Sequence, residues 1–273
     1  MAERTGIEWA DATWNPWMGC TKVSEGCKNC YMFRDMKRYG KDPTRVVRSL
    51  TTFKAPLKWL NDGKVPAGAK IFTCSWSDFF HPDADPWRQE AWDIIGRTPE
   101  FTYLILTKRP ERIAAHLPKN WGEGWPNVWL GVSAENQDRA DERLFLLMNT
   151  PARVRFVSAE PLLGPIDFTR VAVGKRFVDG KWEAERYNAF QDRVLFTDEG
   201  DVELGRIHWV ITGGESDFQA PRPFNPGWVA DIAEECRRHG TALFHKQNGG
   251  TRKVDGAWGG REVIGMVYSE FPR

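Results

Sequence analysis

The stretch FTYLILTKRP, residues 101–110, joins an apolar run to a polar end and sets the pattern for the whole chain. Residues 101–106 are nearly all apolar, which is typical of a strand buried on both faces. Residues 107–110 are the polar turn that ends it. The pattern recurs along the sequence, and a seventh strand is expected before residue 20. The five further apolar runs are residues 71–74, 128–132, 154–157, 207–211 and 242–244.

Helical patterns separate these runs, so the sequence predicts a parallel sheet covered by helices. The expected helices are residues 31–39, 86–96, 110–116, 138–148 and 228–239. We therefore expect an α/β fold that forms a complete or partial (β/α) barrel of the TIM type, as one domain over residues 1–273. An open doubly wound sheet is the alternative.

Residues 165–206 interrupt the alternation and are expected to be an insertion rather than a second domain. Residues 176–187 fit a β-hairpin, with Asp179-Gly180 as its two-residue turn.

Composition limits the class of protein. The 273 residues carry a net charge of +1, so any contact with nucleic acid must come from a local basic patch. No apolar run is long enough for a membrane helix and no signal segment is recognisable, so we expect a cytoplasmic protein without a membrane partner. Three of the five cysteines are clustered, which favours metal binding over disulfides.

These three cysteines lie in one loop. Cys20, Cys27 and Cys30 have the spacing Cys-x6-Cys-x2-Cys. Three thiolates can hold a [4Fe-4S] cluster with one open iron, or a zinc ion that requires a fourth ligand. His81 and His245 each follow an expected strand and are candidates for that fourth ligand. Both kinds of metal site remain open on spacing alone.

Polar residues follow the strands rather than precede them, and in either fold these ends form the active face. Cations there suit a carboxylate, and carboxylates suit an ammonium group or a ribose diol. The glycines after residue 211 let a ligand approach the backbone closely. The expected ligand-binding residues are Ser75, Asp78, Lys108, Ser133, Glu135, Glu160, Gly213, Gly214 and Glu215.

A second set is expected at the substrate. Tryptophan is frequent, with 14 copies, and either packs the core or stacks on a nucleobase. Trp14, Trp17 and Trp76 lie beside polar motifs and are the better pocket candidates. The expected substrate residues are Trp14, Asn15, Arg109, His245, Lys246 and Gln247. A basic segment consists of Lys37, Arg38, Lys41, Arg45, Arg48 and Lys54 and is either a solvated face or a contact for phosphates.

Several strings together resemble one family. The strings TGIEW (5–9), TWNP (13–16), the loop GCTKVSEGCKNCY (19–31), SDFF (77–80), LTKRP (106–110), WLGVS (129–133), AEPLLGP (159–165), GGES (213–216) and KQ (246–247) look like those of the phage-associated three-Cys-motif family, a domain of unknown function. That family is similar to radical S-adenosylmethionine (SAM) enzymes, whose usual loop is Cys-x3-Cys-x2-Cys.

The resemblance implies a (β/α) barrel whose cysteine loop binds a [4Fe-4S] cluster, with SAM as the second cofactor in the strand-end pocket. It implies an enzyme that abstracts hydrogen from a substrate. The phage association suggests a nucleobase or nucleic acid, in modification or repair, and a separately encoded partner protein. The alternative is a zinc- or cluster-stabilised nucleic-acid-binding module without catalysis, which would bind in a strongly salt-dependent way.

Overall fold

The computed structural model describes residues 3–178, 181–197, 200–216 and 220–273. Two compact units are distinguished along the chain, Met1–Gly131 and Val132–Arg273. Each is described by itself. No helix in the described ranges is long and apolar enough to span a membrane.

The first unit is built on parallel strands. Strand β1 (Ala12–Trp14) pairs with β4 (Lys70–Thr73), and β4 pairs with β5 (Thr102–Thr107). A short antiparallel pair, β2 (Trp17–Met18) and β3 (Val47–Arg48), precedes and follows the cysteine loop. Strand β6 (Val128–Ser133) contains the boundary between the units.

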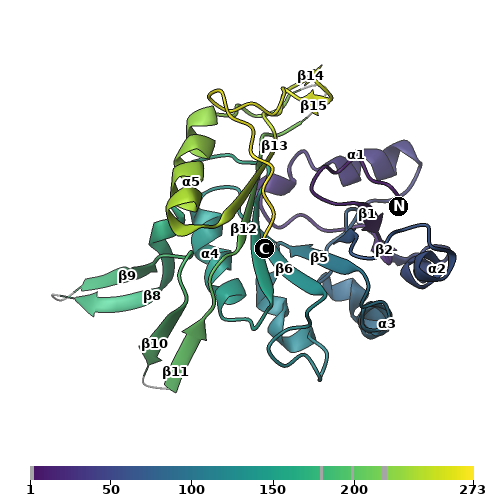
Figure 1. The fold of residues 1–273 in the computed structure, drawn as a ribbon, viewed down its shortest axis with the longest axis horizontal. Coiled ribbons are helices and arrows are strands. Elements are labelled where there is room, and N and C mark those ends of the chain that lie inside the picture. The colour runs from purple at the N-terminus through teal and green to yellow at the C-terminus, as the bar shows by residue number, and fades with distance from the viewer. Residues whose placement is uncertain (1–2, 179–180, 198–199, 217–219) are drawn as a thin grey trace. The chain divides into compact units, whose positions relative to one another are not determined.

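The second unit continues with the same kind of pairing. Strand β12 (Trp209–Gly213) lies between β7 (Val154–Ala159) and β13 (Ala242–Gln247), and both pairings are parallel. The helix α5 (Pro226–His239) packs on β13, where Figure 1 draws both in green tones. A small antiparallel pair, β14 (Lys253–Val254) and β15 (Ala257–Trp258), follows.

The sheet order is β1-β4-β5-β6-β7-β12-β13. These are the seven strands that the sequence predicts, and they follow one another in chain order. A doubly wound sheet would reverse its order at a switch point. The order is therefore compatible with a partial (β/α) barrel, whose two edge strands are β1 and β13.

Most of the expected helices are confirmed. They are α1 (Tyr31–Arg38), α3 (Asp85–Gly96), α4 (Gln137–Met148) and α5; α2 (Ala55–Asp62) was not expected. The helix expected over residues 110–116 is wrong. That segment forms two short 3-10 turns, η3 (Pro110–Arg112) and η4 (Ala114–His116). Pro118 disfavours the helical conformation at Leu117, which is extended, so too few residues remain for an α-helix.

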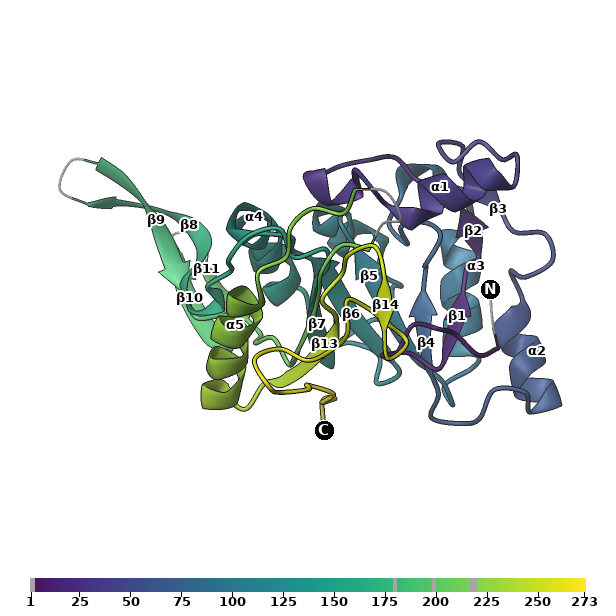
Figure 2. The same ribbon diagram turned by 90° about the horizontal axis from the view of Figure 1, so that it is seen from above.

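The expected insertion contains two hairpins. Strands β8 (Val171–Val178) and β9 (Lys181–Tyr187) are antiparallel, and so are β10 (Arg193–Thr197) and β11 (Gly200–Leu204). The expected turn Asp179-Gly180 lies outside the described residues. Figure 2 shows β8 beside α4, which it contacts, and in Figure 1 both hairpins extend away from α4 and α5.

Candidate functional site

The cysteine loop begins at a tightly fixed backbone position in the first unit. Gly19 has φ +98°, and a Cβ atom there would lie 2.2 Å from the carbonyl oxygen of Arg45, so only glycine fits. Its N–H donates to the Trp76 carbonyl at 3.0 Å, and the Cys20 N–H donates to the Pro43 carbonyl at 2.9 Å. The first cysteine is thereby held between two loops that are remote in sequence.

The other two cysteines lie at the entry to α1. Cys27 ends the 3-10 turn η1 (Glu25–Cys27), and Cys30 is the N-cap residue of α1. All three thiols are free, with Cys27 buried and Cys20 and Cys30 partly exposed. A short loop thus presents three thiols next to the start of a helix, as the spacing predicted.

Arg109 connects this loop to the end of β5. Its Nη1 donates to Cys20 Sγ at 3.7 Å and to Asp78 Oδ2 at 3.1 Å. Its Nη2 donates to the carbonyl and the hydroxyl oxygens of Thr21, at 2.9 and 2.8 Å. The guanidinium therefore fixes the start of the cysteine loop through hydrogen bonds and is itself held by the charge of Asp78.

Asp78 is the acceptor on which this arrangement depends. One carboxylate oxygen accepts the Thr107 hydroxyl and the Phe80 N–H, and the other accepts the Lys108 N–H in addition to Arg109. The carboxylate is almost fully buried, with all these donors around it. Asp78, Lys108 and Arg109, predicted as ligand contacts, are thus brought together, and Asp78 serves to position its neighbours.

Burial disfavours the thiolate form of Cys20 and of Cys30. Burial raises the pKa of Cys20 to about 12, with a further rise from Asp78, while Arg109 opposes both effects. Burial likewise raises the pKa of Cys30, and Lys108 opposes this. A bound cation that replaces the protons would relieve this cost, which is how metal binding is linked to thiol ionisation.

Among the described residues, no group of three or more His, Cys, Asp or Glu side chains is arranged to hold one metal ion. A tetrahedral zinc ion with bonds near 2.3 Å brings its sulfur ligands within about 4 Å of one another. In an iron–sulfur cluster each thiolate binds its own iron, so the thiolates stand further apart.

His81 does not supply a ready fourth ligand. It is almost fully buried, and its Nδ1 accepts the Asp83 N–H at 3.2 Å. Nε2 then carries the proton and donates to the Thr21 hydroxyl, 3.0 Å away. Burial lowers the pKa of His81, in keeping with this neutral form. Both ring nitrogens are engaged.

Trp14 and Asn15, expected at the substrate, lie in the core of the first unit. Trp14 is 0% exposed, and its indole N–H donates to the carbonyls of Thr52 and Phe53. No ring face is left for a nucleobase, so the expected stacking role does not fit its position; Trp17 is buried in the same way. Asn15 binds the Trp76 N–H and the hydroxyl of Ser75, another expected ligand residue.

In the second unit, the expected residues Glu160, Gly213 and Lys246 meet at the carboxyl ends of β7, β12 and β13. The Lys246 ammonium lies 3.0 Å from Glu160 Oε1. A Cβ atom on Gly213 would lie 2.6 Å from the same oxygen, so the absence of a side chain makes room for the ion pair. This ion pair is partly exposed. Among the predicted polar site residues of the second unit, Glu160 and Lys246 are the ones that remain accessible to solvent.

Two further carboxylates have partners that the sequence did not reveal. Glu135 is completely buried and pairs with Arg143 of α4, which also donates to the carbonyl of Ser133. Glu215 pairs with Arg222, which donates to both carboxylate oxygens. In the sequence, Arg143 lies eight residues after Glu135, and Arg222 lies seven residues after Glu215. Other arginines lie at similar distances from carboxylates along the chain, so this spacing alone could not identify the two pairs.

The last expected residues are fixed by hydrogen bonds at the end of β13. His245 is buried between the Thr212 hydroxyl, 2.9 Å from Nδ1, and Asn248 Oδ1, 3.1 Å from Nε2. Burial lowers the pKa of His245 to about 4. The Gln247 side chain donates to the carbonyl of Gly214. A Cβ atom on Gly214 would lie 2.0 Å from the carbonyl oxygen of Asn248. His245 is therefore a neutral, packed side chain.

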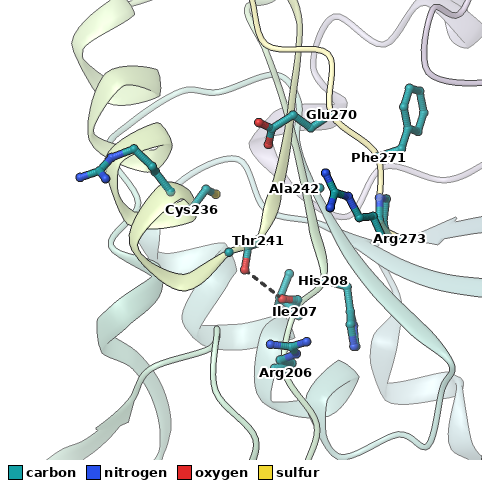
Figure 3. A pocket seen from close by; sticks show the side chains of 12 residues that line it. Arg206, Ile207, His208, Cys236, Thr241, Ala242, Glu270, Phe271 and Arg273 are labelled. Carbon is teal, nitrogen blue, oxygen red and sulfur yellow. Dashed lines mark hydrogen bonds between the residues drawn. The ribbon is translucent and has the colours of Figure 1, made fainter.

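A hollow of about 720 Å³ lies elsewhere in the second unit, at the amino ends of β12 and β13. Figure 3 shows Arg206, His208, Glu270 and Arg273 around it. Arg206, Arg237 and Arg273 line it together with Glu270, so cations outnumber carboxylates among its side chains. None of the predicted site residues lines this hollow.

Comparisons with known proteins give one match. A family model described as "Protein of unknown function (DUF5131)" matches residues 4–272. Searches of curated proteins and of solved structures found no match.

Proposed function

Because the chain belongs to the family described as "Protein of unknown function (DUF5131)", we propose its function from its chemistry: an iron–sulfur enzyme of the radical SAM type. The observation that best supports this proposal is the loop with three free thiols, which Arg109 anchors to the end of β5. Cys20, Cys27 and Cys30 would hold a [4Fe-4S] cluster. SAM at the open iron would supply a radical that abstracts hydrogen from the substrate.

The roles of the protein groups follow from their positions. Arg109 holds the Cys20 end of the loop, and Asp78 holds Arg109. In the second unit, the accessible Glu160–Lys246 pair offers a carboxylate and an ammonium group to a polar ligand. We propose a nucleobase or nucleic acid as substrate, in modification or repair, and a separately encoded partner, in the cytoplasm. A barrel of the TIM type is part of the same proposal.

The hydrogen bonds of His81 support a cluster over zinc bound by three cysteines and a histidine. A protein that used this side chain as a ligand would have to break its contacts with Thr21 and Asp83. Buried polar groups that lose their partners cost free energy, so the zinc alternative starts at a disadvantage.

The test is anaerobic reconstitution followed by iron and sulfide counting. We expect about four irons and four sulfides per chain. The triple variant Cys20→Ala/Cys27→Ala/Cys30→Ala should bind none, while the control Cys236→Ala, whose thiol lies in α5, should bind as the parent does. One zinc per chain and no cluster uptake would refute the proposal. Formation of 5′-deoxyadenosine after reduction with SAM would separate an enzyme from a non-catalytic cluster-binding module.

A further inference from the structure

An exposed aromatic pair lies beside the cysteine loop in the first unit. Tyr39 is 66% exposed and stacks on Trp76, with ring centroids 6.2 Å apart and an angle of 27° between the planes. Trp14 and Trp17 are fully buried in the core, whereas the Tyr39 ring lies mostly outside it. The outer face of Tyr39 is therefore available to a flat partner.

Both rings are fixed with respect to the cysteines. The Trp76 carbonyl accepts the Gly19 N–H at 3.0 Å, one residue before Cys20. Tyr31, the residue after Cys30, donates its hydroxyl to the carbonyl of Ser75 at 2.7 Å. Tyr39 itself follows the last residue of α1, the helix that Cys30 caps. A group stacked on Tyr39 would thus lie next to the cysteine loop.

The chain on both sides of Tyr39 is positively charged. Residues 34–48 contain six basic and two acidic residues, a net charge of +4 in a chain whose total is +1. Lys37 and Arg38 end α1, and Lys41 and Arg45 follow in the next loop; all four are exposed. Within the described residues, Lys37, Arg38 and Lys41 form no ion pair with a carboxylate, whereas Arg45 acts on the Asp42 carboxylate and helps to lower its pKa. The first three cations are thus available to phosphates.

We propose that Tyr39 and Trp76, with the cations Lys37, Arg38, Lys41 and Arg45, form a binding surface for single-stranded nucleic acid. Aromatic faces that stack on bases, flanked by cations that follow the backbone, are the features by which proteins hold unpaired strands. A duplex hides its base faces and would use the cations alone. As the substrate class of the proposed enzyme, single-stranded nucleic acid rests on the proposed function. Binding of the strand to this surface does not itself require the cluster.

The experiment measures fluorescence anisotropy of a labelled twenty-nucleotide single strand of mixed sequence with the full chain. We expect binding that Tyr39→Ala weakens roughly five- to hundredfold, because one stacked base is lost. Lys37→Gln/Lys41→Gln should weaken it further and reduce the slope of log K against log salt by about 1.4, at about 0.7 per phosphate contact. Leu50→Ala and Lys58→Gln/Lys119→Gln, exposed residues of the same unit outside this surface, are the matched controls and should change little.

Several outcomes would overturn the proposal. They are no binding of the single strand, equal or tighter binding of the duplex, and an unchanged affinity in Tyr39→Ala. Equal weakening by the control charge variant would show a nonspecific attraction to polyanions. The triple cysteine variant should still bind the strand, so loss of cluster uptake and loss of strand binding are separate results. Failure of one proposal can therefore be told from failure of the other.

Discussion

The guanidinium of Arg109 lies 3.1 Å from the carboxylate of Asp78, and both side chains are less than 10% exposed. The two residues follow neighbouring parallel strands, Asp78 after β4 and Arg109 after β5. Arg109 also reaches Cys20 and Thr21. A buried ion pair at the strand ends thus determines where the cysteine loop begins.

Asp78→Asn should destabilise the protein by about 3 kcal/mol, because it leaves the Arg109 charge buried without a partner. The loss should be visible in urea unfolding of the full chain. Arg237→Met, which removes an exposed arginine that pairs with Glu234 in the second unit, is the control and should leave unfolding unchanged. An Asp78→Asn variant as stable as the parent would show that the pair is not required for folding.

His81→Gln should keep most of the iron taken up on reconstitution, because both ring nitrogens already have partners within the protein. Iron and zinc are measured per chain, beside Cys27→Ala, which should lose most of the metal. Loss of metal in His81→Gln equal to that in Cys27→Ala would assign the histidine as a ligand. It would favour the zinc alternative.

Much of the fold is readable from the sequence because buried parallel strands are continuous apolar runs. Six of the seven strands of the sheet were expected from that feature, as was the polarity of their ends, and the seventh was expected before the cysteine loop. The sequence did not reveal which charges pair. Asp78 and Arg109 are 31 residues apart, and only the adjacency of β4 and β5 brings them together.

Trp14 shows a second limit of prediction from the sequence, which is whether a side chain faces the core or a pocket. Its neighbours Asn15 and Pro16 suggested a polar pocket, but β1 places the ring against Phe53 and Tyr103 in the core. A three-residue strand is too short to show which face is buried by periodicity alone. Tyr39 gave no signal because an exposed ring at a helix end looks the same in sequence as a packed one.

Gly213→Ala should cost about 1 kcal/mol, because the new methyl group displaces the Glu160 side chain from Lys246. The cost should vanish in a Glu160→Ala background, which removes the atoms that the methyl group meets. Thermal unfolding of the four members of this double-mutant cycle measures the difference. Additive effects would show that Gly213 is required for another reason.

Gly214→Ala should be more damaging, at about 2 kcal/mol or more, because its methyl group meets the backbone of Asn248 and Gly249 rather than a flexible side chain. The same unfolding assay tests this, with Gly213→Ala as the milder reference. A smaller loss in Gly214→Ala than in Gly213→Ala would contradict the contacts described here.

The stability of the second unit should fall as pH rises through neutrality, because of Glu235. Burial raises the pKa of Glu235 to about 7, and the nearby Asp167 carboxylate adds to the rise. The folded chain therefore holds a proton that the unfolded chain has released, and stabilisation present below about pH 4.5 is lost as pH passes 7. The change should amount to roughly 2 kcal/mol. Glu235→Gln keeps a neutral side chain at all pH values and should flatten this part of the profile in urea unfolding between pH 5 and 8. An unchanged slope in that variant would show that another group titrates, since the remaining carboxyl groups and histidines are the same in both proteins.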